Sequence, residues 1–257
     1  MKKVTILMYG ILAYGAFFAS FLYLIGFSGG ILVPKHVDNG IESSMMMALS
    51  INLCLILAFG LQHSIMARPA FKKMITRMIP KSAERSTYVL ATSVVLVALY
   101  VYWRPISGNL WTTESTTMKG IILGIFAFGW MVVLYSTFLI NHFDLFGLRQ
   151  VYLQMRAKEY THLPMKITSL YRIVRHPLML GFLVTMWAVP TMSYGHLLFS
   201  VGMSAYILVG IYFEERTLIK EIGPSYESYR KQVPALIPRP QMPIPAVVSK
   251  EIPVITG

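Results

Sequence analysis

Cysteine, acidic residues and charge in general are scarce in this chain of 257 residues. Only 13% of the residues are charged and 55% are hydrophobic, a balance typical of membrane proteins rather than soluble domains. The single cysteine, Cys54, lies inside an apolar run, so the chain has no disulfide framework, and we interpret the thiol as a small buried hydrophobe. The sequence also lacks internal repeats, glycine-rich phosphate loops and His/Cys clusters with metal-ligand spacing, so we predict no metal site.

The shortage of acidic residues leaves a formal net charge of +12. Such an excess can indicate nucleic-acid binding, but here the basic residues lie in loops between apolar runs rather than on one stripe. Membrane topology explains that distribution better, and we predict no nucleic-acid partner.

Long apolar runs dominate what is present. A spanning helix needs about 20 mostly apolar residues, and four stretches fit or approach that length: 4–27, 45–66, 88–103 (somewhat short) and 120–140. The first is too long, and lacks a clear cleavage site, for a signal peptide. Two shorter runs, 178–189 and 197–213, flank a Pro/Gly turn at 190–195. We therefore predict an all-α, polytopic membrane helical bundle with four spans and a tilted C-terminal helical hairpin.

Loop charge predicts the orientation of the bundle. Loops 67–86 and 141–177 each carry six Lys or Arg residues, and the tail from Glu214 carries six more, whereas loops 28–44 and 104–118 carry one each. The positive-inside rule therefore places both termini and the two basic loops in the cytoplasm. We expect three parts: a transmembrane bundle (1–140), a cytoplasmic cofactor-binding loop with the hairpin and a lid (141–238), and a proline-rich tail (239–257), extended or disordered.

Unusual polar groups gather at the predicted cytoplasmic ends of the spans. They are Gln62-His63-Ser64, Asn141-His142-Phe143-Asp144, Arg175-His176 and Glu214-Glu215. Polar residues at membrane depth are functional candidates by default, although each alone could be an interfacial residue that reaches toward the headgroups. Four such groups on one face favour a shared site.

The start of the hairpin suits a ligand with both charges. Pro177 is well placed for the first turn of a helix, whose free N–H groups and positive dipole end can hold a carboxylate or phosphate. With Arg175 and His176 before it and Glu214 and Glu215 at the far end of the hairpin, we expect a zwitterionic ligand. Downstream, the pattern Gly223-x-x-Tyr226-x-x-Tyr229-Arg230 indicates either an amphipathic surface helix or a lid over the hairpin.

These residues carry a family resemblance. Arg175-His176-Pro177-x-x-x-Gly181, followed by Glu214-Glu215 and the tyrosine pattern up to Val233-Pro234, resembles the isoprenylcysteine carboxyl and phospholipid methyltransferases over roughly residues 165–238. The segments 60–71, 84–90, 103–106 and 141–152 look like the bacterial methanethiol S-methyltransferases of the nurim-related family. Together the two blocks span nearly the whole chain up to Pro238.

The resemblance implies methyl transfer from S-adenosylmethionine to methanethiol, giving dimethyl sulfide, in a bacterial inner membrane with the lipid bilayer and a small thiol as partners. It places the cofactor at the hairpin and near residues 163–166. By motif, the implied contacts are Tyr171, Arg175, His176, Pro177, Leu178, Met179, Glu214, Glu215, Tyr226 and Arg230. Met179 stands where the carboxyl methyltransferases usually have an aromatic residue.

An alkanethiol should have a pKa above the roughly 8.5 of cysteine, so such an enzyme must take or stabilise its proton. The candidates for this work are His63, His142 and Asp144, although Asp144 could instead be salt-linked to Arg149 or His142. Arg85 and Arg104 are interpreted as structural or interfacial, although one of them could polarise the pocket. The candidates for the apolar substrate surroundings are Tyr88, Trp103 and Phe143.

Two other functions stay open at this point. The same cofactor chemistry could act on another small thiol, a lipid amine or an isoprenylated carboxylate. A non-catalytic, nurim-like membrane protein could keep the fold without the reaction. The combination of Arg175-His176-Pro177, Glu214-Glu215 and the tyrosine pair argues against a pure scaffold.

Overall fold

The computed structural model describes residues 3–161, 163 and 167–239. The cofactor contact expected at 163–166 and the tail expected at 239–257 therefore lie almost entirely outside the described residues. Helices make up nearly all of the regular structure: α1 (Lys3–Gly29), α2 (Met45–Met66), α3 (Pro69–Ile75), α4 (Glu84–Tyr102), α5 (Thr116–Ile140), α6 (His142–Leu145), α7 (Leu148–Met155), α8 (Pro177–Trp187), α9 (Tyr194–Ile222) and α10 (Pro224–Gln232), with 3-10 turns at Lys81–Ala83 and Ser169–Arg172.

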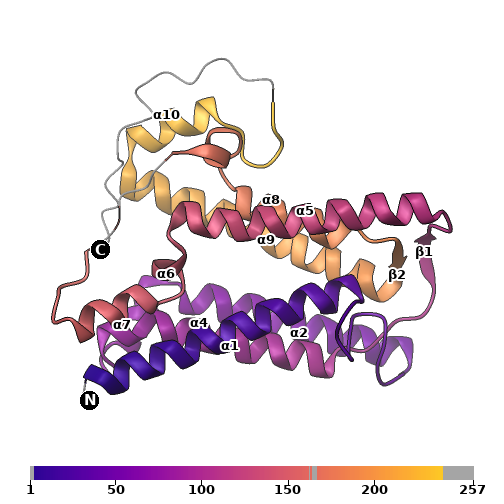
Figure 1. Cartoon of the computed structure of the whole chain (residues 1–257), viewed down its shortest axis with the longest axis horizontal. Coiled ribbons are helices and arrows are strands. Elements are labelled where there is room, and N and C mark those ends of the chain that lie inside the picture. The colour runs from indigo at the N-terminus through magenta and orange to yellow at the C-terminus, as the bar shows by residue number, and fades with distance from the viewer. Residues whose placement is uncertain (1–2, 162, 164–166, 240–257) are drawn as a thin grey trace.

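Five of the described helices are long and apolar enough to cross a membrane: α1, α2, α4 (with the turn before it), α5 and α9. They run along one long axis, and their directions alternate along the chain once the short α8 between α5 and α9 is included (Figure 1). One end of the bundle, here called the α10 end, holds α10, the start of α8 and the short helices α6 and α7; two short strands mark the opposite, sheet end (Figure 1). The prediction of an all-α, polytopic membrane protein is confirmed.

The C-terminal hairpin is asymmetric, and here the prediction of two short arms is wrong for the second arm. Helix α8 has 11 residues, but α9 has 29 and continues through the charged Glu214-Glu215-Arg216 segment. Glu and Arg are good helix formers, so charge ends the apolar run without ending the helix. The chain turns only at Gly223, whose φ of 71° lies in the region that favours glycine. For a similar reason α4 begins at Glu84, earlier than the apolar run suggests.

A small sheet, which the sequence did not indicate, fastens the hairpin to the rest of the bundle. Strand β1 (Asn109–Thr112) pairs antiparallel with β2 (Thr191–Ser193), within the turn predicted at 190–195. The indole of Trp111 also donates to the carbonyl of Val189 at 3.2 Å. Strand β2, of 3 residues, follows the short α8 and leads the chain to the sheet end, where α9 begins.

Serine side chains start three of the long helices at the sheet end. Ser44, Ser115 and Ser193 precede α2, α5 and α9, and each hydroxyl accepts from a backbone N–H of the first turn. These N-caps satisfy donors that a helix start leaves unpaired, which matters most where water is scarce.

Close backbone contact seats α8 against α5. A Cβ on Gly181 would lie 2.9 Å from both the carbonyl oxygen of Gly129 and the backbone nitrogen of Val133. Small residues allow such approach between helices in a membrane. The central core is aromatic, with Phe27, Trp103 and Phe199 fully enclosed, whereas many Leu, Ile, Val and Phe side chains face outward. Cys54 is among the exposed side chains, so the interpretation of a buried thiol is wrong.

Candidate functional site

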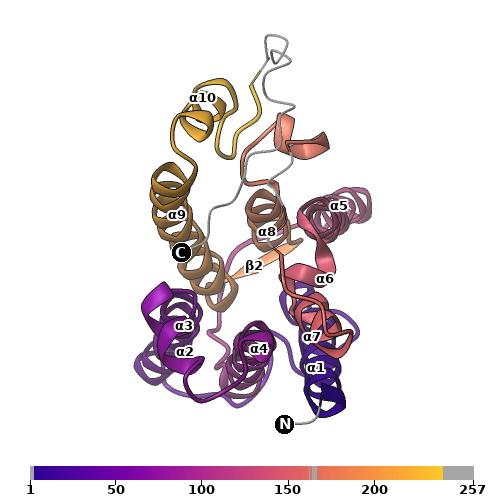
Figure 2. The same cartoon turned by 90° about the vertical axis from the view of Figure 1, so that its left-hand side faces the viewer.

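The start of α8 is held in place by the segment that follows α10. The backbone N–H groups of Arg175 and His176 donate to the carbonyls of Pro234 (2.9 Å) and Ala235 (3.1 Å). His176 is the N-cap residue of α8, and Pro177 occupies its first turn. The C-terminal segment therefore folds back onto the beginning of the hairpin, beside the charged end of α9 (Figure 2).

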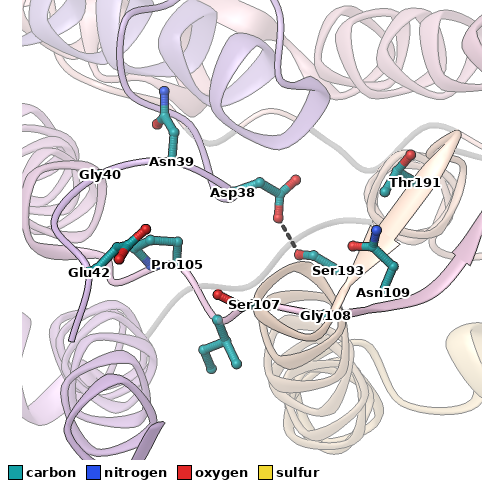
Figure 3. Close-up of a pocket in the computed structure, with 11 residues that line it drawn as sticks. Asp38, Asn39, Gly40, Glu42, Pro105, Ser107, Gly108, Asn109, Thr191 and Ser193 are labelled. Atoms are coloured by element: carbon teal, nitrogen blue, oxygen red, sulfur yellow. Dashed lines mark hydrogen bonds between the residues drawn. The ribbon is translucent and has the colours of Figure 1, made fainter. Parts of the chain in front are cut away.

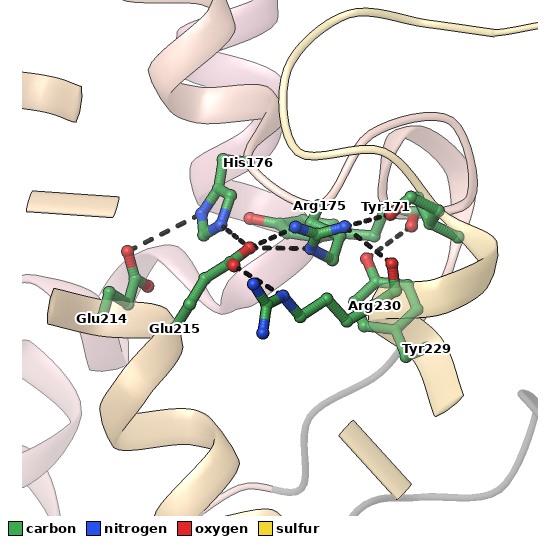
Figure 4. Close-up of polar contacts among 8 residues, drawn as sticks. Tyr171, Arg175, His176, Glu214, Glu215, Tyr229 and Arg230 are labelled. Carbon is green, nitrogen blue, oxygen red and sulfur yellow. Dashed lines mark hydrogen bonds and ion pairs between the residues drawn. The ribbon is translucent and has the colours of Figure 1, made fainter. Parts of the chain in front are cut away.

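Arg175 and Glu215 form a buried ion pair at this junction. The Arg175 guanidinium donates to Oε1 of Glu215 from Nε at 2.8 Å and from Nη2 at 2.5 Å. Its Nη1 donates to the carbonyls of Arg230 at 3.0 Å and of Val233. Figure 4 shows Glu215 between His176 and the two arginines. All three guanidinium nitrogens of Arg175 are thus engaged within the protein, so this residue positions α10 rather than presenting a charge to a ligand.

Glu214 and Arg230 are two charged side chains of this junction that remain accessible. Their side chains are 49% and 51% exposed, against 7% for Arg175 and 11% for Glu215. His176 lies between the two glutamates, with Nδ1 3.7 Å from Oε2 of Glu214 and Nε2 3.1 Å from Oε1 of Glu215. The result is a rim, defined here by Glu214, Arg230 and the first turn of α8, that offers charges of both signs.

Two tyrosines of α10 face inward and close the rim from one side. Tyr226 and Tyr229 are buried with Tyr171 and Val233, and the Tyr229 hydroxyl donates to the Tyr171 carbonyl at 2.6 Å. Burial, reinforced by the nearby Glu215 carboxylate, raises the pKa of Tyr226 to about 12. Helix α10 therefore turns its tyrosines toward Tyr171 and the end of α9 instead of presenting them to a bilayer surface, and its role as a lid stays a prediction.

His63 forms a hydrogen-bonded group with two side chains of α4. Its Nε2 lies 2.6 Å from the Tyr88 hydroxyl, and its Nδ1 lies 3.3 Å from the hydroxyl of Thr92. Tyr206 of α9 packs edge-on against the same imidazole. The sequence predicted a catalytic role for His63 and a substrate contact for Tyr88, and the structure joins the two side chains by a hydrogen bond.

His142 has a separate set of partners. Its Nε2 lies 2.8 Å from the Tyr14 hydroxyl and its Nδ1 2.8 Å from the Thr137 hydroxyl. Burial lowers the pKa of this imidazole, which favours its neutral form. Phe143, next to it, is 52% exposed and packs near the Tyr14 ring.

Asp144 pairs with basic and phenolic neighbours rather than with a histidine. Arg149 donates to one carboxylate oxygen at 3.0 Å and the Tyr160 hydroxyl to the other at 3.1 Å. This is the salt-linked alternative to a catalytic role.

Trp103 is separated from every other candidate. It is fully buried at the sheet end, where its indole donates to the Val37 carbonyl at 3.1 Å. The 19 residues of α4, at about 1.5 Å each, place it about 28 Å from Glu84 at the other end of that helix. Its substrate contact stays a prediction, and the structure does not bring Trp103 together with the other candidates, because a helix carries the two ends of this apolar run to opposite ends of the bundle.

Arg85 joins elements that sequence reasoning treated separately. Its guanidinium carbon lies 4.9 Å from the centre of the Tyr88 ring, and its Nε donates to the Leu145 carbonyl of α6 at 2.7 Å. The spacing of Tyr88 and Thr92 by four residues was a usable signal for neighbours on one helix face. Nothing in the pattern pointed to Tyr14.

The sheet end has a cavity of its own. About 400 Å³ in volume, it is lined by Asp38, Glu42, Asn109 and Ser193 among others, and the Ser193 hydroxyl donates to Asp38 (Figure 3). None of the predicted site residues lines it. Within the described part of the chain, no group of three or more His, Cys, Asp and Glu side chains could hold a metal ion.

The sequence profile of the NnrU protein family matches residues 51–239. The chain belongs to this family. Methanethiol S-methyltransferase 2 of Bradyrhizobium diazoefficiens is 47% identical over 237 residues, which cover 92% of this chain and 91% of the relative. Methanethiol S-methyltransferase of Mycobacterium tuberculosis is 47% identical over 240 residues, covering 93% and 98%.

More distant relatives are eukaryotic. Nurim of Xenopus laevis is 26% identical over 208 residues, covering 76% of this chain and 70% of the relative. No solved structure matches the chain. The resemblance to methanethiol S-methyltransferases of a nurim-related family is thus confirmed.

Proposed function

We propose that this chain transfers a methyl group from S-adenosylmethionine to methanethiol, at the cytoplasmic end of a bacterial inner-membrane bundle, and releases dimethyl sulfide. The observation that carries the proposal is the rim, where half-exposed Glu214 and Arg230 flank a helix start above an apolar bundle. The names of relatives at 42–47% identity over at least 92% of this chain supply the acceptor.

The charges at the rim fit the proposed donor. S-adenosylmethionine carries an ammonium and a sulfonium, which a carboxylate can stabilise, and Glu214 is the accessible carboxylate there. The carboxylate of S-adenosylmethionine, in turn, needs N–H donors or a cation. The first-turn N–H groups of α8, from Leu178 and Met179, have no partner within the helix, and Arg230 is the exposed cation of the rim. When bound, the donor supplies an electrophilic methyl group.

Other residues that the family motif implies at the cofactor hold the rim in place rather than contact the donor. Arg175 and Glu215 satisfy each other and fasten the segment after α10 to the start of α8. His176 sets the distance between the two glutamates, and Pro177 fixes the first turn. Tyr171 and Tyr226 pack the lid against the hairpin. We propose that these residues shape the rim and that Glu214, Arg230 and the α8 start touch the donor.

Apolar, water-poor surroundings suit this reaction. A thiolate and a sulfonium lose their charges as the methyl group moves, so a low-dielectric site need not oppose the transition state. Holding the acceptor in line with the methyl group removes much of the entropic barrier. The aromatic surroundings of Tyr88 suit a small, lipid-soluble thiol.

Orientation follows from loop charge. The α10 end carries the two basic loops and the charged end of α9, so the positive-inside rule assigns it to the cytoplasm, where S-adenosylmethionine is made. Both termini would then be cytoplasmic.

Purified, detergent-solubilised protein with S-adenosylmethionine and methanethiol tests the proposal by headspace gas chromatography. We expect dimethyl sulfide to form in step with S-adenosylhomocysteine. Turnover of the donor with a larger thiol or a lipid amine, but not with methanethiol, would correct the acceptor. Absence of both donor binding and turnover would contradict the proposal and favour a nurim-like protein without the reaction.

A further inference from the structure

Two tyrosine–histidine–threonine groups of the same design lie at the α10 end. The Tyr88 triad consists of Tyr88, His63 and Thr92; the Tyr14 triad consists of Tyr14, His142 and Thr137. In each, an imidazole is held between a phenol at Nε2 and a threonine hydroxyl at Nδ1. The further hydrogen bonds of the two threonines favour one tautomer of each imidazole.

The threonine fixes the tautomer of His63. The Thr92 hydroxyl donates its one proton to the Tyr88 carbonyl at 3.0 Å. With that bond made, its oxygen accepts from His63, which favours the tautomer with the hydrogen on Nδ1 of the imidazole. Nε2 is left with its lone pair, 2.6 Å from the Tyr88 hydroxyl. Tyr88 therefore donates to a neutral imidazole that is ready to take a proton.

The Tyr14 triad repeats this logic. Thr137 donates to the Leu134 carbonyl at 2.6 Å, which favours Nδ1 of His142 as the donor to Thr137 and Nε2 as the acceptor from Tyr14. The rings packed around Tyr14 and His142 are aromatic, among them Phe143 and Phe146.

A cation distinguishes the two triads. The Arg85 guanidinium lies over the Tyr88 ring at 4.9 Å, and its hydrogen bond to the Leu145 carbonyl holds it there. A fixed positive charge beside a phenol stabilises the negative charge that develops on its oxygen while a proton is in transit. Among the contacts described for Tyr14 there is no such cation.

The Tyr88 triad also lies below the rim. The ring of Tyr206 lies 6.2 Å from that of His63, measured between centroids, and Tyr206 precedes Glu214 on α9 by eight residues. At about 1.5 Å per residue, the triad is about 12 Å deeper along the bundle than the accessible carboxylate. An acceptor at Tyr88 would sit between the rim and the apolar core.

We propose that the Tyr88 oxygen is the group that takes the proton of the thiol substrate, while Tyr88 passes its own proton to Nε2 of His63. The inference rests on the proposed function and names the proton acceptor of that reaction. The S–H bond breaks with its electron pair left on sulfur, and an O–H bond forms on Tyr88 as the old one breaks. His63 becomes an imidazolium that donates to Thr92 and Tyr88.

The thiolate sulfur then forms the new S–C bond, while the bond between that methyl carbon and the donor sulfonium breaks and leaves its electron pair on the donor sulfur. His63 later releases its extra proton to water through Tyr88, which restores the starting state. Thr92 and Arg85 are positioning residues: the first fixes the imidazole tautomer, and the second stabilises the phenol oxygen during transfer.

Nuclear magnetic resonance of isotope-labelled histidines tests the resting triad without any turnover. The signals of His63 are assigned by their loss in His63→Gln. We expect its Nδ1 to be protonated and its Nε2 unprotonated near neutral pH, and Thr92→Val to remove that preference. A His63 with the hydrogen on Nε2 would overturn the proposal, because that nitrogen could not accept from Tyr88.

Kinetics of Tyr88→Phe, with Tyr14→Phe as the matched control, test the step itself. General acid–base catalysis contributes roughly 10²- to 10⁴-fold, so we expect Tyr88→Phe to lower kcat by about 100-fold or more near neutral pH while binding of S-adenosylmethionine is unchanged. Tyr14→Phe, the same chemical change in the other triad, should stay within about threefold of the unmodified protein.

The pH profile separates a lost relay from a damaged fold. Because the thiol ionises unaided at high pH, the rate of Tyr88→Phe should rise about tenfold per pH unit up to the pKa of the thiol and approach that of the unmodified protein. A defect independent of pH, a near-normal rate for Tyr88→Phe, or a larger defect in Tyr14→Phe would overturn the relay. Unmodified protein that makes no dimethyl sulfide at any pH would instead overturn the proposed function.

Discussion

At the scale of single residues, two adjacent glutamates do different work. Glu215 is buried against Arg175 and His176, whereas the side chain of Glu214 is half exposed. Sequence reasoning predicted the pair but could not divide its roles, because both carboxylates belong to one motif. Only the position of Arg175, held also by the Arg230 and Val233 carbonyls, decides which one is structural.

Substitution of each glutamate by glutamine tests this division. Breaking a buried ion pair leaves an uncompensated charge and costs roughly 3–5 kcal/mol, so Glu215→Gln should lower the free energy of unfolding by about that amount. Glu214→Gln should change it by less than about 1 kcal/mol. Denaturant titration in one detergent measures both, and equal losses would show that the carboxylates share the structural role.

At the scale of elements, hydropathy predicted the bounds of the spanning helices better than the segments that connect them. The second span agrees with α2, and the fourth ends with α5 at Ile140. Hydropathy did not predict the full length of α9 or the pairing of β1 with β2. A charged helical extension and a three-residue strand produce no apolar periodicity in the sequence. The seating of α8 depends on glycines at which only the structure reveals close backbone contact.

Gly181→Val should therefore disturb the site from a distance. A Cβ at this position meets the backbone of Gly129 and Val133 at 2.9 Å, so α8 would have to move away from α5 and carry His176 with it. We expect a lower melting temperature and weaker binding of S-adenosylmethionine. Gly124→Val is the matched control, since a Cβ on Gly124 meets nothing within 4 Å. Equal behaviour of the two variants would contradict this account of the helix contact.

The packing of α10 should become less stable at alkaline pH. Tyr226 has a pKa of about 12 in the fold against roughly 10 in an unfolded chain, so the folded state favours the protonated phenol. Its contribution is complete below about pH 10 and is lost as pH rises toward 12, at up to about 1.4 kcal/mol per pH unit. Melting temperatures measured across this range should fall less steeply for Tyr226→Phe. Parallel curves for the two proteins would show that this phenol stays neutral in both states.

At the scale of the whole molecule, charge and chemistry coincide at one end. The rim, the Tyr88 triad and the basic loops share the α10 end, and the polar cavity is lined by residues of the opposite end, beside β1 and β2. The sequence predicted that polar groups at the ends of the spans would gather on one membrane face, because that prediction needs only the direction of each helix. It could not predict which histidine meets which tyrosine, because those contacts join α2 to α4 and α1 to α6.

Labelling in intact cells tests the orientation. In a Cys54→Ser background, Ser228→Cys on α10 and Ser107→Cys near the sheet end both lie at exposed positions. We expect a membrane-impermeant maleimide to label position 107 in intact cells and position 228 only after the membrane is opened. The reverse pattern would place the rim outside the cytoplasm and remove the argument for its donor.

The central claim is that the rim seats a charged methyl donor through Glu214. Calorimetric titration of S-adenosylmethionine into the unmodified protein and into Glu214→Gln measures this directly. A hydrogen bond to a charged group is worth about 1.5–3 kcal/mol, so we expect one donor per chain in the unmodified protein and binding weakened by about tenfold or more in the folded variant. Equal affinity in the two proteins would contradict the claim.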